Sequence, residues 1–159
     1  MPLPRVRVIG PADALLPLCL ELRRQVFSCE QGVPVAIESD GREGECVHFA
    51  AVAEDGRVLG TARMRSVPGC IAKAERVAVL GSARGLGVGR ALMRQLEAKA
   101  ASTGHTAVQL GAQAAVVGFY QRLGYVPRGP RYEEAGIEHQ LMERRAPGPS
   151  AAGEGGVEG

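Results

Sequence analysis

Residues 75–92 read ERVAVLGSARGLGVGRAL, and this stretch carries the most information about the fold. An apolar strand around Val77, Ala78 and Val79 leads into the glycine-rich turn Arg84–Arg90, and an amphipathic helix follows. Glycines at positions 85, 87 and 89 remove side chains where the helix begins, so backbone N–H groups can converge on an anion. The sequence therefore predicts a diphosphate-binding turn between a strand and a helix.

Spacing separates this turn from two other phosphate-binding motifs. A P-loop needs Gly-Lys followed by Ser or Thr, whereas Arg90 and Ala91 follow the last glycine here. A dinucleotide fingerprint needs a third glycine or alanine, but Arg90 or Leu92 occupies that position, and no acidic residue stands near position 107. The pattern that remains is R-x-x-G-x-G after a strand. By itself, this hexapeptide is equally compatible with a turn that binds no ligand.

Outward from this stretch, the chain alternates between strand-like and helix-like segments. Ahead of it we expect a strand at 5–9, a helix at 12–27 and a loop of about fifteen residues. Strands should follow at 48–53, 58–65 and 73–80, and a hairpin turn at Asp55-Gly56 should join the first two of them. Beyond it we expect a helix at 86–101, a strand at 107–110, a helix at 114–123 stopped by Gly124, and strands at 125–128 and 137–143. This order predicts the α/β class, with a mixed central sheet flanked by helices.

The composition is that of one globular domain. The 159 residues are 45% hydrophobic and 23% charged, and the net charge of +2 argues against a nucleic-acid or membrane-surface partner. No apolar run is long enough to span a membrane, and the first residues lack the apolar core of a signal peptide. The four cysteines have no metal-binding spacing, so we expect reduced thiols, no metal and a cytoplasmic location. We expect a domain at 1–145 and a flexible Gly/Ala/Pro-rich tail at 146–159.

Two motifs together resemble a known superfamily. Residues 84–89, RGLGVG, resemble the acetyl-CoA signature of the GNAT N-acetyltransferases, and FYQRLGY at 119–125 resembles the helix-end motif of that superfamily. The strings RQVF (24–27), EQGVP (30–34), LGAQA (110–114) and YEEAGIEH (132–139) are similar to the ElaA-like branch, as are Glu38, Asp40 and His48. The resemblance covers about residues 5–145 and implies the GNAT, or acyl-CoA N-acyltransferase, fold.

The resemblance also implies acetyl-CoA as co-substrate and a set of residues that contact it. Main-chain groups of the strand would bind the pantetheine arm, the turn would bind the pyrophosphate, and Gln113 stands where many members have an asparagine. The implied cofactor-binding residues are Val77, Ala78, Val79, Arg84, Gly85, Leu86, Gly87, Val88, Gly89, Arg90 and Gln113.

Two residues are candidates for catalysis. Tyr120 matches the tyrosine that lies near the cofactor sulfur in the superfamily, and a phenol can protonate the leaving thiolate. Its alternative role is a packed core ring. Glu75 is the one carboxylate on the strand just before the cofactor-binding residues, and it could accept the proton of the amine directly or through water. Its alternative role is a surface carboxylate paired with an arginine.

The acceptor site is outlined by polar or scarce residues in segments that should border it. These are Phe27, Glu30, Gln31, Asp40, His48 and His139. Glu30 and Asp40 could bind a cationic amine, and either histidine could relay a proton. Each also has a local alternative, such as a helix end, a turn or a hydrogen bond to a loop. Arg23, Arg24, Arg63 and Arg65 are expected on solvated faces or in salt bridges.

Together these observations predict an N-acetyltransferase that uses acetyl-CoA and a primary amine acceptor, a small molecule, a peptide or a lysine. We expect direct attack in a ternary complex, because no cysteine lies in the motifs to carry an acyl group. The alternative is a non-catalytic module that binds acyl-CoA as a sensor or regulator. Members of the superfamily often dimerise, so a homodimer is compatible with the sequence.

Overall fold

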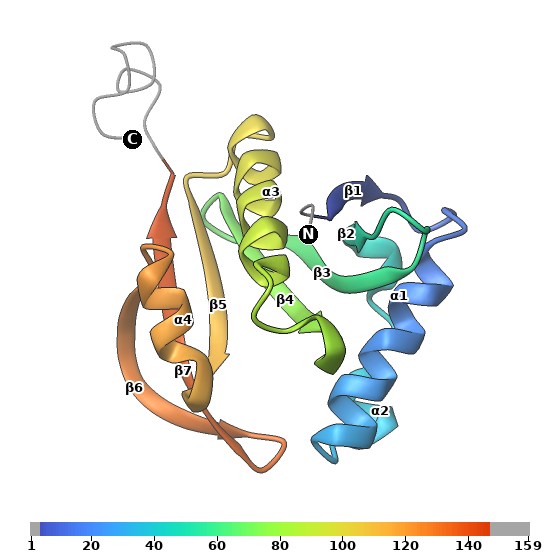
Figure 1. Cartoon of the computed structure of the whole chain (residues 1–159). Helices are drawn as coiled ribbons and strands as arrows, with labels where there is room; N and C mark the ends of the chain where they lie inside the picture. Colours follow the sequence, from blue (N-terminus) through green and yellow to red (C-terminus); the bar gives the residue numbers. More distant parts are fainter. Residues whose placement is uncertain (1–3, 147–159) are drawn as a thin grey trace. The chain divides into compact units, whose positions relative to one another are not determined.

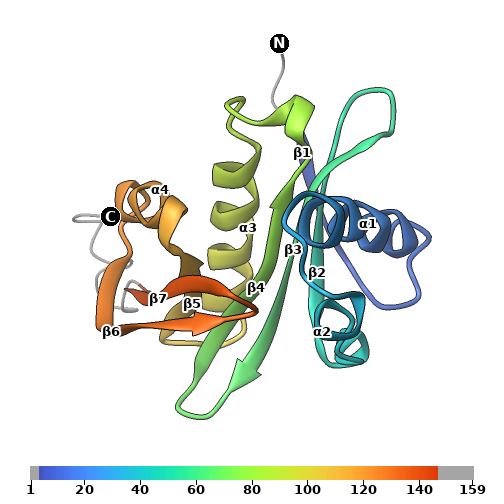
Figure 2. The same cartoon turned by 90° about the horizontal axis from the view of Figure 1, so that it is seen from below.

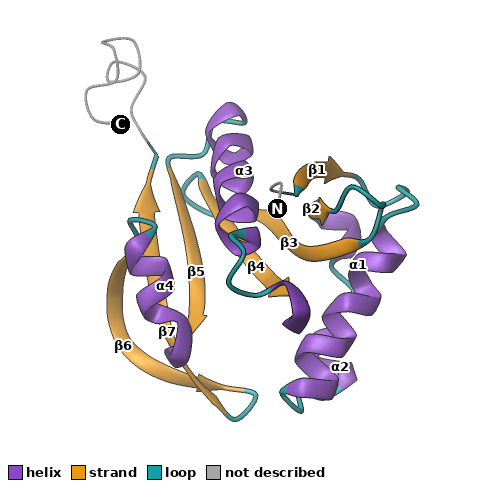
Figure 3. Ribbon diagram, in the orientation of Figure 1, coloured by secondary structure: helices purple, strands orange, loops and turns teal. Residues whose placement is uncertain are grey.

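The computed structural model describes residues 4–146, which contain strands and helices in alternation (Figures 1 and 3). The hydrogen-bonded strand order is β1-β2-β3-β4-β5-β7-β6. The pairs β1/β2, β2/β3, β5/β7 and β6/β7 are antiparallel, whereas β4/β5 is parallel. The prediction of a mixed sheet in an α/β protein is therefore confirmed. The expected tail lies, apart from Ala146, outside the described residues.

The described residues form two compact units. Unit 1 comprises the chain up to Arg65 together with Ala74–Leu96, and unit 2 comprises Ser66–Lys73 together with the chain from Glu97 onward. Within residues 4–146, no helix is both long enough and apolar enough to cross a lipid bilayer.

Unit 1 is built on four neighbouring strands. They are β1 (Arg5–Ile9), β2 (Val47–Val52) and most of β3 (Val58–Val67) and β4 (Ile71–Val79). Asp55-Gly56 forms the predicted turn between β2 and β3, where Gly56 has a φ of 90° that favours glycine. Figure 2 shows α1 and α2 on one side of these strands and α3 on the other.

Helix α1 (Leu16–Arg23) covers one face of unit 1 because its apolar residues recur at helical spacing. Leu16, Cys19, Leu22 and the following Val26 are buried against Ile9, Ala50, Val58 and Ala78 of the strands. The expectation of a regular helix over 12–27 was wrong at both ends. Asp13 accepts hydrogen bonds from the N–H groups of residues 15 and 16, which makes a turn before the helix. Beyond residue 23 the chain continues as a π-helix, Arg24–Glu30.

The segment expected to be a loop contains two short helices. These are α2 (Val35–Glu38) and a 3₁₀ turn at Glu43–Glu45. The other face of the strands is covered by the first part of α3 (Val88–Ser102). A Cβ atom on Gly60 of β3 would lie 2.8 Å from a methyl carbon of Val88 and 3.0 Å from one of Leu92. The glycine thus permits close approach of strand and helix.

Unit 2 contains the parallel pair and the last hairpin. β5 (Ala107–Gln113) pairs with Ile71–Lys73 of β4 and with β7 (Ile137–Arg145), and β7 pairs with β6 (Val126–Glu134). β5 and β6 are each longer than predicted. A 3₁₀ turn at Ala114–Val116 leads into α4 (Val117–Arg122), which ends before Gly124 at a φ of 102°.

Strand β6 ends the hydrogen-bonded order and is exposed along its whole length. It contains Pro127 and Pro130, and its pairing with β7 is interrupted between Arg128 and Tyr132. A proline has no N–H to donate to a neighbouring strand, so this outer edge offers a broken row of donors.

Candidate functional site

The glycine-rich turn lies where the sequence predicts it, between β4 and α3 of unit 1. A 3₁₀ turn at Gly81–Ala83 follows β4, and α3 begins at Val88. Gly85 and Gly87 have φ angles of 80° and 83°, a left-handed conformation that suits glycine. The first turn of α3 carries no acidic residue, so its unpaired N–H groups and the helix dipole favour an anion. These features fit a pyrophosphate group.

Arg84 connects this turn with the segment after α1. Its Nε donates to the carbonyl oxygen of Val79 at 3.0 Å, and its Nη2 lies 2.7 Å from Oε1 of Glu30. Both charged side chains are close to half exposed. The structure therefore pairs a predicted acceptor-binding residue, Glu30, with a predicted cofactor-binding residue.

The strand that leads into the turn has an unusual backbone at Arg76. This residue has a φ of 54°, which is left-handed and rare for residues with a side chain. Its guanidinium donates to the carbonyl oxygens of Ile37 and Glu38 at 3.2–3.3 Å, and Nη2 lies 3.5 Å from Oδ2 of Asp40. These contacts hold the local distortion immediately before Val77.

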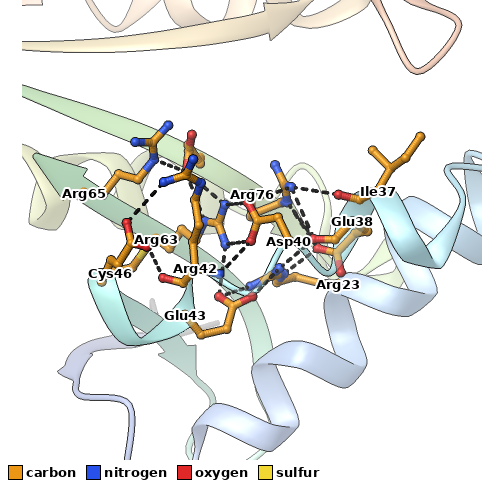
Figure 4. Close-up of polar contacts among 12 residues, drawn as sticks. Arg23, Ile37, Glu38, Asp40, Arg42, Glu43, Cys46, Arg63, Arg65 and Arg76 are labelled. Carbon is orange, nitrogen blue, oxygen red and sulfur yellow. Dashed lines mark hydrogen bonds and ion pairs between the residues drawn. The ribbon is translucent and has the colours of Figure 1, made fainter. Parts of the chain in front are cut away.

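Charged side chains from α1, α2, the following loop and the strands form one group in unit 1, shown in part in Figure 4. We name it the arginine–carboxylate cluster. It comprises Arg23, Arg63, Arg65, Arg76, Glu38, Asp40, Glu43 and Glu75. Arg23 and Arg63 are almost fully buried, with 2% and 1% of their surface exposed. A buried charge is tolerated only with close counter-charges, which the four carboxylates supply.

Arg63 lies at the centre of the cluster. Its Nη2 is 2.6 Å from Oδ2 of Asp40, its Nη1 is 3.1 Å from Oε1 of Glu43, and its Nε is 3.1 Å from Oε1 of Glu75. Hydrogen bonds from Arg63 hold the pKa of Asp40 well below its usual value. Two predicted site residues, Asp40 and Glu75, thus meet on one arginine.

Glu75 is anchored through a single oxygen atom. Its Oε1 accepts from Nε of Arg63 and from Nε of Arg65, both at 3.1 Å. Burial opposes ionisation of this carboxyl, but the hydrogen bond from Arg65 and the charge of Arg63 outweigh it, so its pKa is lowered. Within the described part of the chain, Oε2 accepts no hydrogen bond. The carboxylate is therefore fixed, charged and open at one atom.

The remaining predicted acceptor residues of unit 1 have mainly local roles. His48 is 1% exposed, and its Nε2 lies 3.0 Å from the carbonyl oxygen of Glu43, in the loop before β2. Phe27 packs against the core under α1. Gln31 ends the π-helix and is exposed. The contacts of His48 and Phe27 do not by themselves identify an acceptor site.

Three predicted residues belong to unit 2. Tyr120 on α4 is buried, and its ring makes edge contacts with Phe119 and Tyr125; burial raises the pKa of its phenol. Gln113 lies opposite His139 in the β5/β7 pairing, and the His139 ring stacks on that of Tyr132. Tyr120 is therefore a protonated phenol in an apolar setting.

Sequence reasoning missed most of the cluster. Arg23 and Arg63 were expected on solvated faces or in salt bridges; the structure has the salt bridges, but in the interior of unit 1. One signal was available for Arg63, which interrupts the otherwise small and apolar run VLGTARM at 58–64. A charged residue in a strand buried on both faces needs a partner, but the sequence does not say which. In residues 4–146 no three His, Cys, Asp or Glu side chains are grouped as metal ligands.

Comparisons with known proteins agree with the motifs. Residues 25–146 match the acetyltransferase (GNAT) domain family. The chain is 38% identical over 137 residues to the uncharacterized N-acetyltransferase YjcF of Bacillus subtilis, which covers 85% of this chain and 96% of that protein. It is 36% identical over 131 residues to the protein ElaA of Escherichia coli, covering 79% and 84% of the two chains.

Solved structures show the same fold. The crystal structure of Escherichia coli ElaA superposes with a TM-score of 0.78 at 29% identity, covering 89% of this chain and 99% of that one. An acyl-CoA N-acyltransferase from Pseudomonas aeruginosa superposes with a TM-score of 0.76 at 32% identity, covering 88% and 99%. With the glycine turn between β4 and α3, these matches show that the chain belongs to the GNAT acetyltransferase family and is similar to its ElaA-like members.

Proposed function

We propose that this protein transfers the acetyl group of acetyl-CoA to a primary amine by direct attack in a ternary complex. The observation that carries the proposal is the open oxygen of Glu75, which stands on the strand that continues into the glycine turn. The strand thus carries a carboxylate oxygen that can accept a hydrogen bond from an amine, and it leads into a turn that can bind an anion. This arrangement fits a reaction between an amine and a phosphorylated carrier.

Acetyl-CoA supplies the activated acetyl thioester. On the protein side, the N–H groups of Gly85–Arg90 bind its pyrophosphate, with Arg84 and Arg90 adding positive charge. Main-chain groups of Val77–Val79 bind the pantetheine arm, and the amide of Gln113 adds a further contact. Family membership and the similarity to an acyl-CoA N-acyltransferase from Pseudomonas aeruginosa support this choice of co-substrate.

The amine must lose its proton to become a nucleophile, because a free alkylamine is mostly charged near neutral pH. Oε2 of Glu75 accepts a hydrogen bond from the amine or from a water molecule that carries the proton to solvent. The lowered pKa of Glu75 makes it a weak base, which favours orientation of the amine and the water-mediated route.

Transfer forms a nitrogen–carbon bond and breaks the carbon–sulfur bond. The phenol of Tyr120 provides the proton that the leaving sulfur needs, and solvent restores that proton to the phenol. The role of Tyr120 rests on the superfamily motif, whereas the raised pKa keeps the phenol protonated but makes it a weaker acid.

An acyl-enzyme route has less support. Cys46 lies beside the cluster, but its thiol is buried and donates to the carbonyl oxygen of Arg42 at 3.2 Å. Burial raises the pKa of this thiol, so little reactive thiolate is present.

The test measures release of coenzyme A from acetyl-CoA in the presence of a panel of amines, with calorimetry of acetyl-CoA binding alongside. We expect acceptor-dependent release in wild type and a strong loss in Glu75→Gln with unchanged acetyl-CoA affinity. If the protein bound acetyl-CoA but released no coenzyme A with any amine, the alternative function of a non-catalytic acyl-CoA sensor would be favoured instead. Absence of binding would contradict both functions.

A further inference from the structure

Arg65 differs from the other arginines of the arginine–carboxylate cluster. Arg23 and Arg63 each use both terminal nitrogens in hydrogen bonds to carboxylates or a carbonyl. Arg65 donates only from Nε, to Oε1 of Glu75 at 3.1 Å. Among the described residues, Nη1 and Nη2 of Arg65 make no hydrogen bond, and 23% of this side chain is exposed. In Figure 4 the end of its guanidinium points away from the other labelled side chains.

An open guanidinium edge therefore lies beside an open carboxylate oxygen. Arg65 and Glu75 are joined by their hydrogen bond, which holds the two open ends close to each other. A carboxylate oxygen accepts from an amine or ammonium group, and the two terminal nitrogens of an arginine bind a carboxylate in a paired geometry. The pair therefore offers one group that can bind an anion, the guanidinium of Arg65, and one that can bind a cation, the carboxylate of Glu75.

The charges of the cluster are balanced, which bears on the class of acceptor. Four arginines face four carboxylates, and the acids expected to attract a cationic amine are already paired. Asp40 is paired with Arg63 and Arg76, and Glu30 is paired with Arg84. A polycationic acceptor would gain little from such a group, whereas a zwitterion adds one charge of each sign and keeps the balance.

We propose that the acceptor is an amino acid, whose carboxylate binds the terminal nitrogens of Arg65 while its amino group meets Oε2 of Glu75. This inference rests on the proposed function, because it places the amine that is acetylated at Glu75. Arg65 is then the residue that selects acceptors bearing a carboxylate on the carbon that carries the amine.

The test compares matched acceptors that differ only in the carboxylate. Suitable pairs are L-leucine with 3-methylbutylamine and L-phenylalanine with 2-phenylethylamine, assayed by coenzyme A release from acetyl-CoA. Wild type is expected to favour the amino acid of each pair by about 10- to 100-fold in kcat/KM, the effect of one charged hydrogen-bonding pair. In Arg65→Met this preference should disappear, because the amino acid loses more activity than the plain amine, beyond any loss that both acceptors share through Glu75. Arg65→Lys should keep part of it, because lysine retains the charge without the paired geometry.

Arg57→Met is the matched control, because Arg57 is an exposed arginine paired with Asp55 on the β2–β3 turn. It should retain the wild-type preference. Calorimetry of acetyl-CoA binding and circular dichroism verify that each variant is folded.

Three results would overturn the inference. Equal rates for both members of each pair in wild type would refute amino-acid selection and leave the proposed acetyl transfer standing. Equal loss of both acceptors in Arg65→Met, with acetyl-CoA affinity intact, would show that Arg65 acts only by holding Glu75. No coenzyme A release with any acceptor would contradict the proposed function itself.

Discussion

The Nε atom of Arg23 lies 2.6 Å from Oε2 of Glu38, and both side chains are buried. The residues are fifteen positions apart, on α1 and α2. This contact, with two further hydrogen bonds from Arg23 to Glu43, ties the short helices after α1 to the core of unit 1.

Replacement of Arg23 by Met should destabilise the protein strongly. The substitution leaves buried Glu38 with less counter-charge, and breaking a buried pair from one side costs about 3–5 kcal/mol. Urea unfolding measures the loss. Arg24→Met, which removes the neighbouring exposed arginine, should change stability little. Similar losses for the two variants would contradict the structural role of Arg23.

Tyr120→Phe tests whether Tyr120 is the general acid. The variant keeps the buried ring but loses the proton donor, so we expect kcat to fall by about 10²- to 10⁴-fold. Acetyl-CoA affinity, measured by calorimetry, should stay at the wild-type value. An unchanged kcat would eliminate Tyr120 as the acid.

Gly60→Ala should destabilise unit 1 because the new methyl group would lie 2.8 Å from Val88 and 3.0 Å from Leu92. Overpacking of this kind costs about 1–3 kcal/mol. Thermal and urea unfolding check the loss. Gly10→Ala is the control, since no atom lies within 4 Å of its added carbon. If both variants were equally stable, the close packing of β3 on α3 would be refuted.

Stability should fall on acidification. The pKa values of Asp40, Glu43 and Glu75 are lowered in the folded state from ordinary values of 3.8, 4.5 and 4.5. Their contribution is therefore fully present above those ordinary values and is lost as pH falls through the lower folded-state values. Urea unfolding at a series of pH values should show a plateau near neutrality and a decline below about pH 4.5. Asp40→Asn should show a shallower decline, and a slope equal to that of wild type would contradict the assignment.

Glu30→Gln should raise the affinity for acetyl-CoA. In the structure Glu30 neutralises Arg84, so its removal leaves the guanidinium available to the pyrophosphate. Both side chains are close to half exposed, so we expect only about a two- to five-fold effect that shrinks at high salt. Calorimetry at two ionic strengths measures it, with Glu45→Gln as the control. A lower affinity in Glu30→Gln would mean that Glu30 positions Arg84 productively.

The sequence predicted the features that depend on local patterns. Strand alternation, the Asp55-Gly56 turn, the helix stop at Gly124 and the turn at 84–90 follow from properties of neighbouring residues, and the structure has each of them. Boundaries were less accurate. The helix expected at 12–27 begins at Leu16, because Asp13 accepts the N–H groups that would otherwise start it, and it changes to a π-helix at Arg24.

The charged interior could not be predicted because it depends on pairings between distant segments. Arg63 meets Asp40, Glu43 and Glu75, which are 23, 20 and 12 positions away along the chain. An isolated arginine in a strand normally indicates a solvated edge, and only the fold brings its carboxylates together. The same pairings give Glu75 its orientation, so its environment also lay beyond sequence reasoning.

The outer strand β6 has a consequence for behaviour at high concentration. Two prolines and the interrupted pairing leave few consecutive donors for a foreign strand to dock against. This edge of the sheet is therefore a poor template for a strand of a second copy, so stacking of copies through β6 is disfavoured.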